Sequence, residues 1–504
     1  MTGDIALIST ADIARLAGQS RSTVGNWKAR HADFPAAVSR TSRGPLYDRT
    51  EVEQWLQSTN RALKVGTKAR SAVAIAADGG HPAAGAFSDP EDILSAVVFL
   101  AVRQNCTDDE WAAFVAGAPD LAGDTIRAYI RSKVGLSASV IDGDDWSPPP
   151  GELQRVLSEI SEMDVSEIAK TVDELLDTYL ASEIGSRAVL VPPAVRSLMA
   201  GLANPGDSDV IYQAGPGLAQ TAVHAAKPHS AQRLYVQELT DRGAGIASLN
   251  IEVHDLDATV ASGDIFTKDA FPELRAECVV CTPPWDPRAP HLADNADDPR
   301  WVWGEPGIND SHFAWIQHCL YHLADGAGHA VILVPNSALA GRGRSARIRR
   351  RIVQADLLRA VISLPPGALP GTQVRGALLV FSRTPPPDDW GILMVDLADK
   401  DRHSSAPPVI LDSLLVAQTV DTYRDWIRGG AGTGWIGTGA TAQALAANDY
   451  VLDPARYQPV VGADVSSGEQ MIRTYVSMSY RLEALLAAGR EIDDQLKEKV
   501  VNKG

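Results

Sequence analysis

Between residues 186 and 383, short apolar runs alternate with stretches of helical pattern. The runs are DVIYQAG, RLYVQEL, AECVVCTPPW, HAVILVPNS, LRAVISLPP and GALLVFS. Strands that alternate with helices form a mostly parallel sheet with helices on both faces, so we expect an α/β fold. Ligands of such sheets bind at the carboxyl ends of the strands, and the turns after these runs are therefore the candidate functional positions.

The chain has 504 residues, too many for one ordinary domain. Composition and pattern predict five segments: a helix-turn-helix domain at 1–61, a linker at 62–87, a helical domain at 88–180, the α/β domain at 181–385 and a C-terminal region at 386–504. We expect the last region to be a small α+β unit for recognition or interaction that ends in a long helix at about 468–499. The apolar spacing of that helix would allow two copies to pair as a homodimer.

The excess of acids gives the chain a net charge of −17, which argues against a protein that coats nucleic acid along its whole length. The sequence has no 18-residue apolar run and no basic-then-apolar secretory signal, so we expect no membrane contact. Four cysteines in a chain this long do not build a disulfide framework, and we expect a cytoplasmic protein.

The first 70 residues are basic, with eleven Lys/Arg against six Asp/Glu. Residues 12–18 (DIARLAG) predict a short helix that stops at Gly18, and Ser20 or Ser22 would cap a second one through Val24 and Trp27. Two short helices around a glycine turn, followed by a strand and a closing helix at 45–56, indicate a winged helix-turn-helix. The alternative is a small structural domain with solvated charges.

This N-terminal segment resembles the winged helix-turn-helix domains of MerR and excisionase-like proteins. The resemblance implies that six side chains face DNA: Arg21, Ser22, Thr23, Asn26, Lys28 and Arg30.

The turn Thr282-Pro283-Pro284-Trp285 directly follows an apolar run. Two prolines end a strand abruptly because neither offers an N–H to the next strand. A hydroxyl, a prolyl carbonyl and an aromatic ring together suit an amine on a flat ring, since the oxygens can accept its N–H groups while the aromatic side chain stacks. The alternative is a strand-ending turn with a packed tryptophan.

Residues 188–383 resemble the amino-methylating DNA methyltransferases, most closely the modification subunits of type I restriction systems. The resemblance rests on this turn, on LVPPAVRSLMAGL, on RLYVQEL and SGDIF, and on the basic helix and LP-ended strand that follow. In that family an Asn-Pro-Pro-aromatic turn holds an adenine flipped out of the duplex, which gives this role to Thr282, Pro283, Pro284 and Trp285.

The same resemblance implies a Rossmann-like core that binds S-adenosylmethionine. It places Pro192 on a helix over the cofactor and Gly215 and Gly217 in the glycine loop. It also places Glu238 on the ribose hydroxyls and Asp264 near the adenine amine.

The sequence departs from the family pattern at the glycine loop and at the turn. Ile211 stands where the family has an acid for the methionine ammonium, Pro216 removes an N–H donor, and Thr282 replaces Asn. Two interpretations therefore stay open. One is an adenine-N6, or cytosine-N4, methyltransferase that acts on double-stranded DNA beside a specificity or restriction subunit. The other is an inactive methyltransferase-like regulator or assembly subunit that binds DNA.

A run of arginines follows the turn, and we expect phosphate contacts from Arg347, Arg349, Arg350 and Arg351. The alternative is a solvated helix face. Cys278 and Cys281 have CxxC spacing but lie in an apolar strand whose alternation cannot direct both at one ion. We therefore expect buried thiols there and no metal site.

Overall fold

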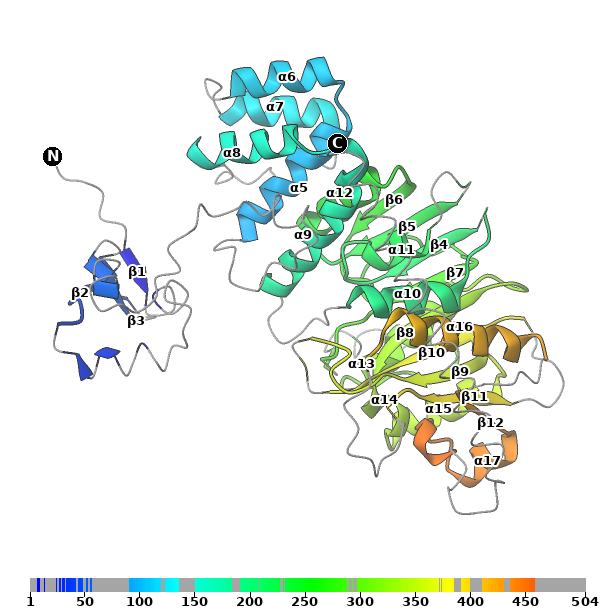
Figure 1. The fold of residues 1–504 in the computed structure, drawn as a ribbon. Helices are drawn as coiled ribbons and strands as arrows, with labels where there is room; N and C mark the ends of the chain where they lie inside the picture. Colours follow the sequence, from blue (N-terminus) through cyan, green and yellow to red (C-terminus); the bar gives the residue numbers. More distant parts are fainter. Residues whose placement is uncertain are drawn as a thin grey trace, which may run out of the picture.

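The computed structural model describes parts of residues 7–56 and then residues 90–118, 123–135, 150–183 and 191–457, the last range with short gaps in its loops (Figure 1). The expected linker at 62–87 and the expected helix at 468–499 lie outside the described residues. Within the described ranges, no helix is long and apolar enough to cross a membrane.

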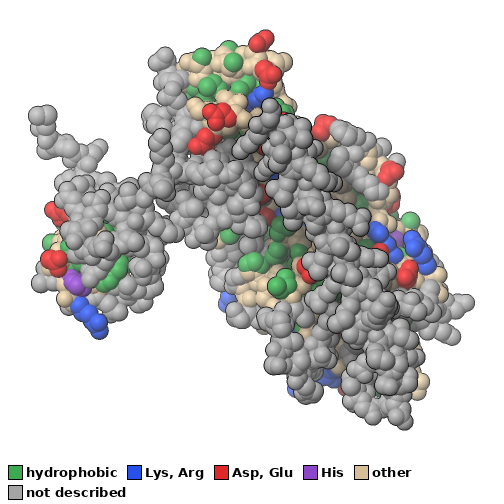
Figure 2. Space-filling model, viewed as in Figure 1, with side chains coloured by type: hydrophobic (Ala, Val, Ile, Leu, Met, Phe, Trp, Pro, Cys, Tyr) green, Lys and Arg blue, Asp and Glu red, His purple; other side chains and the backbone are tan. Residues whose placement is uncertain are grey.

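The N-terminal body contains a small antiparallel sheet. Its strands β1 (Leu7–Ser9), β3 (Gly44–Asp48) and β2 (Ala37–Thr41) lie side by side in that order. Lys28 and Arg30 are exposed helical residues, and the Lys28 ammonium lies 5.1 Å from the centre of the Tyr47 ring. Figure 2 shows basic side chains projecting from this body. Arg21, Ser22, Thr23 and Asn26 lie outside the described residues, so the helix-turn-helix stays a prediction.

Five helices form the bundle expected at 88–180. They are α5 (Pro90–Gln104), α6 (Asp108–Gly117), α7 (Gly123–Val134), α8 (Pro150–Ser161) and α9 (Ile168–Glu183), with the 3-10 turn η3 (Val165–Glu167) before α9. α5 is buried along most of its length because it lies among the other helices. α5 and α9 also pack on α12 (Asp241–Val253), so the core of the bundle continues into the α/β part (Figure 1).

A nine-stranded sheet forms the centre of the α/β part. Its strands are β4 (Val210–Ala214), β5 (Arg233–Glu238), β6 (Asp257–Ser262), β7 (Cys278–Cys281), β8 (His329–Pro335), β9 (Leu358–Ser363), β10 (Gly376–Ser382), β11 (Ile392–Asp396) and β12 (Thr438–Ala440). They lie in the order β12-β11-β9-β10-β8-β7-β4-β5-β6. β10 runs antiparallel to both of its neighbours and β12 is antiparallel to β11, while the other neighbours are parallel.

Helices cover both faces of this sheet, as expected from the alternating pattern. α10 (Pro193–Ala203), α11 (Gln220–Ala225), α12 and α16 (Ser413–Ile427) share a core on one face. α13 (Ser311–Tyr321), α14 (Asn336–Ala340) and α15 (Arg344–Gln354) cover the other. The central strands β8, β9 and β10 are buried on both faces, which explains why their sequences are continuously apolar.

The described residues after 385 belong to the same sheet, which corrects the expectation of a separate α+β unit in that range. β11 pairs with β9 and β12 closes the edge, while α16 packs on α10 so closely that a Cβ on Gly201 would lie 2.6 Å from Val420. Short elements α17 (Ala442–Ala447) and η5 (Pro454–Arg456) complete this edge. The strands before and after the proline-rich break at 385–387 therefore belong to one sheet.

A buried ion pair joins the helical bundle to the α/β part. The Arg196 guanidinium on α10 donates to both carboxylate oxygens of Asp177 on α9, at 2.7 and 2.9 Å. Gln220 on α11 donates to the same carboxylate at 2.9 Å. The side chains of Arg196 and Asp177 are only 5% and 15% exposed, so the pair is largely shielded from water.

Replacing Asp177 by Ala should leave the Arg196 guanidinium buried without its anion. We expect a loss of about 3–5 kcal/mol and a lower Tm by calorimetry. The control is Asp124→Ala, which removes the exposed partner of Arg127 on α7 and should leave Tm nearly unchanged. Equal Tm losses in the two variants would contradict a special role for the α9–α10 pair.

Candidate functional site

The glycine loop and the Thr282 turn leave the sheet side by side. β4 and β7 are parallel neighbours, and Ala214 at the end of β4 pairs with Cys281 at the end of β7. The Thr282 hydroxyl donates a hydrogen bond of 3.1 Å to the carbonyl of Pro216 in the loop. Because this bond uses the only hydrogen of the hydroxyl, the Thr282 oxygen is left as an acceptor.

The backbone of the glycine loop needs glycine at two positions. Gly215 has φ +87° and Gly217 has φ +141°, both outside the range that other residues favour. A Cβ on Gly215 would also lie 2.8 Å from the Trp315 ring, which forms a wall of the loop together with Phe266. The next two residues, Leu218 and Ala219, have positive φ as well, so the turn into α11 is strained.

Glu238 holds this strained turn from the end of β5. Its carboxylate accepts the Leu218 N–H at 2.7 Å and also the N–H groups of Gly217 and Ala219. Glu238 is 4% exposed. Burial raises the pKa of Glu238 to about 8, although the three N–H groups favour the anion.

Asp264 and Pro192 lie at the same end of the sheet. Asp264 begins the segment that follows β6, and Pro192 directly precedes α10. The N–H of Gly263 donates to the carbonyl of Glu238, the last residue of β5, at 2.9 Å. The next residue, Asp264, therefore lies close to the end of β5. The Asp264 side chain is half-buried and accepts the Phe266 N–H at 2.9 Å. Pro192 is the half-buried N-cap of α10.

The turn after β7 is only partly open. Pro283 is buried, and Pro284 and Trp285 are half-buried. The Trp285 ring packs against the start of β10, where a Cβ on Gly376 would lie 3.2 Å from it. Stacking of this ring on a base therefore stays a prediction, since one edge of the indole is already packed.

One expected phosphate contact is wrong. Arg349 is 3% exposed, and its guanidinium donates to the carbonyls of Tyr450 at 2.7 Å and of Gly341 at 2.9 Å. It lies beside Ile348 and Ile352 on the buried face of α15, where it fastens the segment near Tyr450. Arg347, Arg350 and Arg351 are exposed on the outer face of the same helix.

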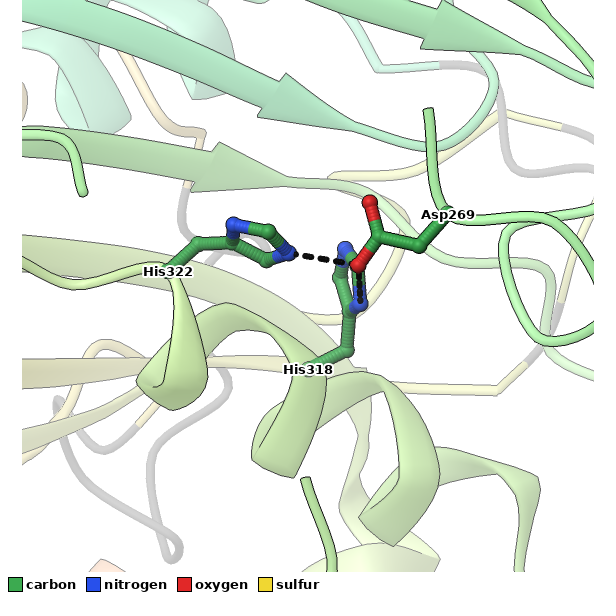
Figure 3. A group of neighbouring side chains, drawn as sticks. All are labelled: Asp269, His318 and His322. Atoms are coloured by element: carbon green, nitrogen blue, oxygen red, sulfur yellow. Dashed lines mark hydrogen bonds and ion pairs between the residues drawn. The ribbon is translucent and has the colours of Figure 1, made fainter. Parts of the chain in front are cut away.

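The structure also brings together a group that the sequence analysis missed. Asp269, His318 and His322 offer ligand atoms that all lie within 4.8 Å of one another, as Figure 3 shows. His318 lies on α13 and His322 is the C-cap of that helix, and this i, i+4 spacing was the signal available in the sequence. Carboxylate and imidazole groups at this spacing are typical zinc ligands.

A guanidinium fills the position that a metal ion would take. Arg300 Nη1 lies 3.0 Å from His318 Nδ1 and 3.9 Å from the Asp269 carboxylate. Arg300 is anchored by Asp298 at 2.5 Å and by the Ile265 carbonyl at 2.7 Å, so it is not free to leave. We interpret the group as an internal ion-pair network.

The protonation of the network follows from its hydrogen bonds. Both ring nitrogens of His322 have partners, the Leu274 carbonyl at 3.0 Å and the Asp269 carboxylate at 2.9 Å. Burial opposes ionisation of Asp269, but the bond from His322 and the positive charge nearby outweigh it and lower the pKa of Asp269 to about 2. Burial lowers the pKa of His318, which bonds Tyr212 at 2.9 Å as a neutral ring.

This network fixes the loop beyond the Thr282 turn. Arg300 belongs to that loop, and its bonds to the carbonyls of Ile265 and Phe266 attach it to the segment that carries Asp264. The network therefore holds the two sides of the candidate site at a fixed distance, although none of its charged groups is placed to bind a ligand.

Comparisons with known proteins identify the family of the chain. The model of the family described as N-6 DNA Methylase matches residues 168–463. The methylase subunit of the type I restriction enzyme HindI from Haemophilus influenzae is 24% identical over 278 residues, which are 53% of this chain and 61% of that protein. The MjaVIII methylase subunit from Methanocaldococcus jannaschii is 26% identical over 49% of this chain and 46% of its own length.

A solved structure shows the same fold. The methyltransferase subunit of the type I restriction-modification system from Streptococcus thermophilus superposes with a TM-score of 0.59 at 17% identity, covering 69% of this chain and 79% of that one. The chain spans about half to three fifths of the length of the two curated relatives above.

The ion-pair network makes the stability depend on Asp269. Asp269→Asn should cost about 3–5 kcal/mol at pH 7, because it removes the buried anion that bonds His322 at 2.9 Å and lies 3.9 Å from the Arg300 guanidinium. The folded pKa of Asp269 lies below its unfolded value, so its contribution is present above about pH 4 and is lost as the pH falls toward 2. The Tm difference between variant and wild type should therefore shrink near pH 3.

The control for this prediction is Asp257→Asn, which breaks an exposed pair with Arg233 in the same sheet. Its Tm should stay close to the wild-type value at both pH values. If Asp269→Asn and this control had equal Tm values at pH 7, the network would not contribute to the stability of the fold.

Proposed function

Because the chain belongs to the N-6 DNA methylase family, we propose that it transfers a methyl group from S-adenosylmethionine to the exocyclic amine of a flipped base in DNA, with adenine N6 as the target. The hydrogen bond from Thr282 to Pro216 carries this proposal, because it leaves an acceptor beside the glycine loop. The curated relatives are methylase subunits of type I restriction enzymes. We extend the proposal to a restriction-modification setting in the cytoplasm, with double-stranded DNA as substrate and a specificity or restriction subunit as partner.

The residues present fit the adenosine half of S-adenosylmethionine better than its methionine half. Glu238 would bind the ribose hydroxyls, Asp264 the adenine amine, and Gly215 and Gly217 let the backbone approach. Ile211 is fully buried within β4, so this position offers no acid for the methionine ammonium. When bound, S-adenosylmethionine supplies an already activated methyl group.

The work left to the protein is to position the amine. In this proposal, Thr282 Oγ accepts one N–H of the amine and the Pro283 carbonyl accepts the other. Accepting hydrogen bonds from both N–H groups would turn the nitrogen lone pair out of conjugation with the ring and toward the methyl group. The methyl group would exchange its bond to sulfur for one to nitrogen, and one of the two N–H protons would then leave to solvent. Trp285 would contact the face of the base.

DNA would reach the site across the exposed face of α15. Arg347, Arg350 and Arg351 are exposed there, and the helix packs against α13 beside the loop that follows the Thr282 turn. The bond from Arg351 to the Trp303 carbonyl, at 3.3 Å, connects helix and loop. The acidic side chains seen on the helical bundle in Figure 2 make that surface a poor alternative for phosphate contact.

The buried Ile211 favours the second candidate, a methyltransferase-like subunit that binds DNA without catalysis. Calorimetric titration of S-adenosylmethionine into the purified chain, with and without duplex, separates the two. Micromolar binding that Glu238→Ala weakens supports the enzyme. No binding in either titration supports the inactive subunit.

Thr282→Val keeps the shape of the side chain but removes the acceptor and the bond to Pro216. We expect methyl transfer to fall by about 10²–10³-fold, as for the loss of one transition-state hydrogen bond, with the Kd of S-adenosylmethionine within a few-fold of wild type. Thr282→Ser keeps the hydroxyl and should stay active. The measurement is tritium transfer to unmethylated DNA followed by nucleoside analysis for N6-methyldeoxyadenosine, and full activity of Thr282→Val would refute the assignment.

Changing Arg347, Arg350 and Arg351 together to Gln should reduce the slope of log K against log salt for DNA binding by about 2 to 3, since each lost phosphate contact removes about 0.9. The matched control changes the same amount of charge on α7 through Arg127, Arg131 and Lys133. Its slope should equal the wild-type slope. An unchanged slope in the α15 variant would make that helix a solvated face.

A further inference from the structure

Gln213 has a polar atom without a partner at the end of β4. The residue is fully buried, and its Oε1 accepts the N–H of Ala222 in the first turn of α11 at 2.9 Å. Its Nε2 has no hydrogen-bond partner among the described residues and no contact with solvent. A buried donor without an acceptor is costly, and such groups in native proteins call for an explanation.

The hydrogen bond at Oε1 fixes the orientation of the Gln213 amide. Only the oxygen can accept from Ala222, so the nitrogen is the atom that faces the opposite direction. There it lies 3.2 Å from the point that a Cβ on Gly217 would occupy, and Thr282 Oγ lies 3.5 Å from the same point. The Nε2–H groups of Gln213 therefore lie between the glycine loop and the Thr282 turn, next to the position that a side chain on residue 217 would occupy.

We propose that the Nε2–H of Gln213 donates to the carboxylate at the amino-acid end of S-adenosylmethionine. This inference rests on the proposed function and adds a binding residue to it. The sulfur of the cofactor carries both the ribose and the amino-acid chain, and its methyl group must face Thr282. Since Glu238 on β5 takes the ribose, the amino-acid end lies toward β4, between Glu238 and the turn after β7.

The carboxylate is the acceptor at that end that matches a neutral donor. A hydrogen bond to a charged oxygen is also stronger than one between neutral groups. With Ile211 in place of an acid, the ammonium lacks its counter-ion, and the carboxylate becomes the charged group of this end that the loop can recognise. Gln213 thus has two roles: Oε1 caps α11, and Nε2 binds the cofactor.

The test must separate cofactor binding from the capping of α11. Gln213→Glu keeps an oxygen for Ala222 but replaces the donor by a second oxygen. Gln213→Met keeps the volume without either group, and it answers the question if the buried carboxylate of the first variant prevents folding. Two ligands are titrated by calorimetry at pH 8: S-adenosylhomocysteine, which has the amino-acid end, and 5′-methylthioadenosine, which lacks it.

We expect both variants to bind S-adenosylhomocysteine about 10- to 100-fold more weakly, with the Kd of 5′-methylthioadenosine within twofold of wild type. The control is Gln237→Glu in β5, a buried amide whose groups are all bonded, to Gly263, Lys268 and Ala270. It should affect the two ligands equally. If the Gln213 variants lost affinity for the two ligands equally, or lost none, the inference alone would be overturned. If the wild type bound neither ligand, the proposed function would be overturned and the inference with it.

Discussion

The parallel pairing of β4 with β7 is the constraint on which the site depends. Because Ala214 and Cys281 are paired at the same level, the loop after one strand and the turn after the other must begin side by side. The two prolines end β7 at that level, and the glycines let the β4 loop turn back over the sheet. The hydrogen bond from Thr282 to Pro216 then joins two segments that are 66 residues apart in sequence.

The parts that could be predicted from sequence are those with a local pattern. Continuous apolar runs indicated buried parallel strands, and their order gave the position of the turn at Thr282 and of Glu238 at the end of β5. Arg349 could not be assigned in this way, since its partner carbonyl at Tyr450 is 101 residues away. The same holds for Arg300, whose contacts come from three separate segments, and for the apolar run at β11, which follows a proline-rich break typical of a boundary.

The two groups of buried polar residues differ in how well they are satisfied. Around Asp269, every charge has an opposite charge and every histidine nitrogen a partner, and that group lies behind the site. At the site itself, Glu238 has a raised pKa, Gln213 has a free N–H, and Leu218 and Ala219 have positive φ. A raised pKa, an unpaired donor and positive φ thus coincide at the loop where the proposed function places a ligand.

The carboxylate of Asp177 makes the glycine loop and the helical bundle parts of one equilibrium. It accepts hydrogen bonds from Arg196 of α10 and from Gln220, the first residue of the helix into which the loop runs, so α9 is bonded directly to the end of the loop. A macromolecule that rigidifies the bundle therefore removes part of the entropy that a small ligand would otherwise lose on ordering the loop. By reciprocity, the small ligand must raise the affinity of the bundle for that macromolecule by the same factor, even when the two ligands are not in contact.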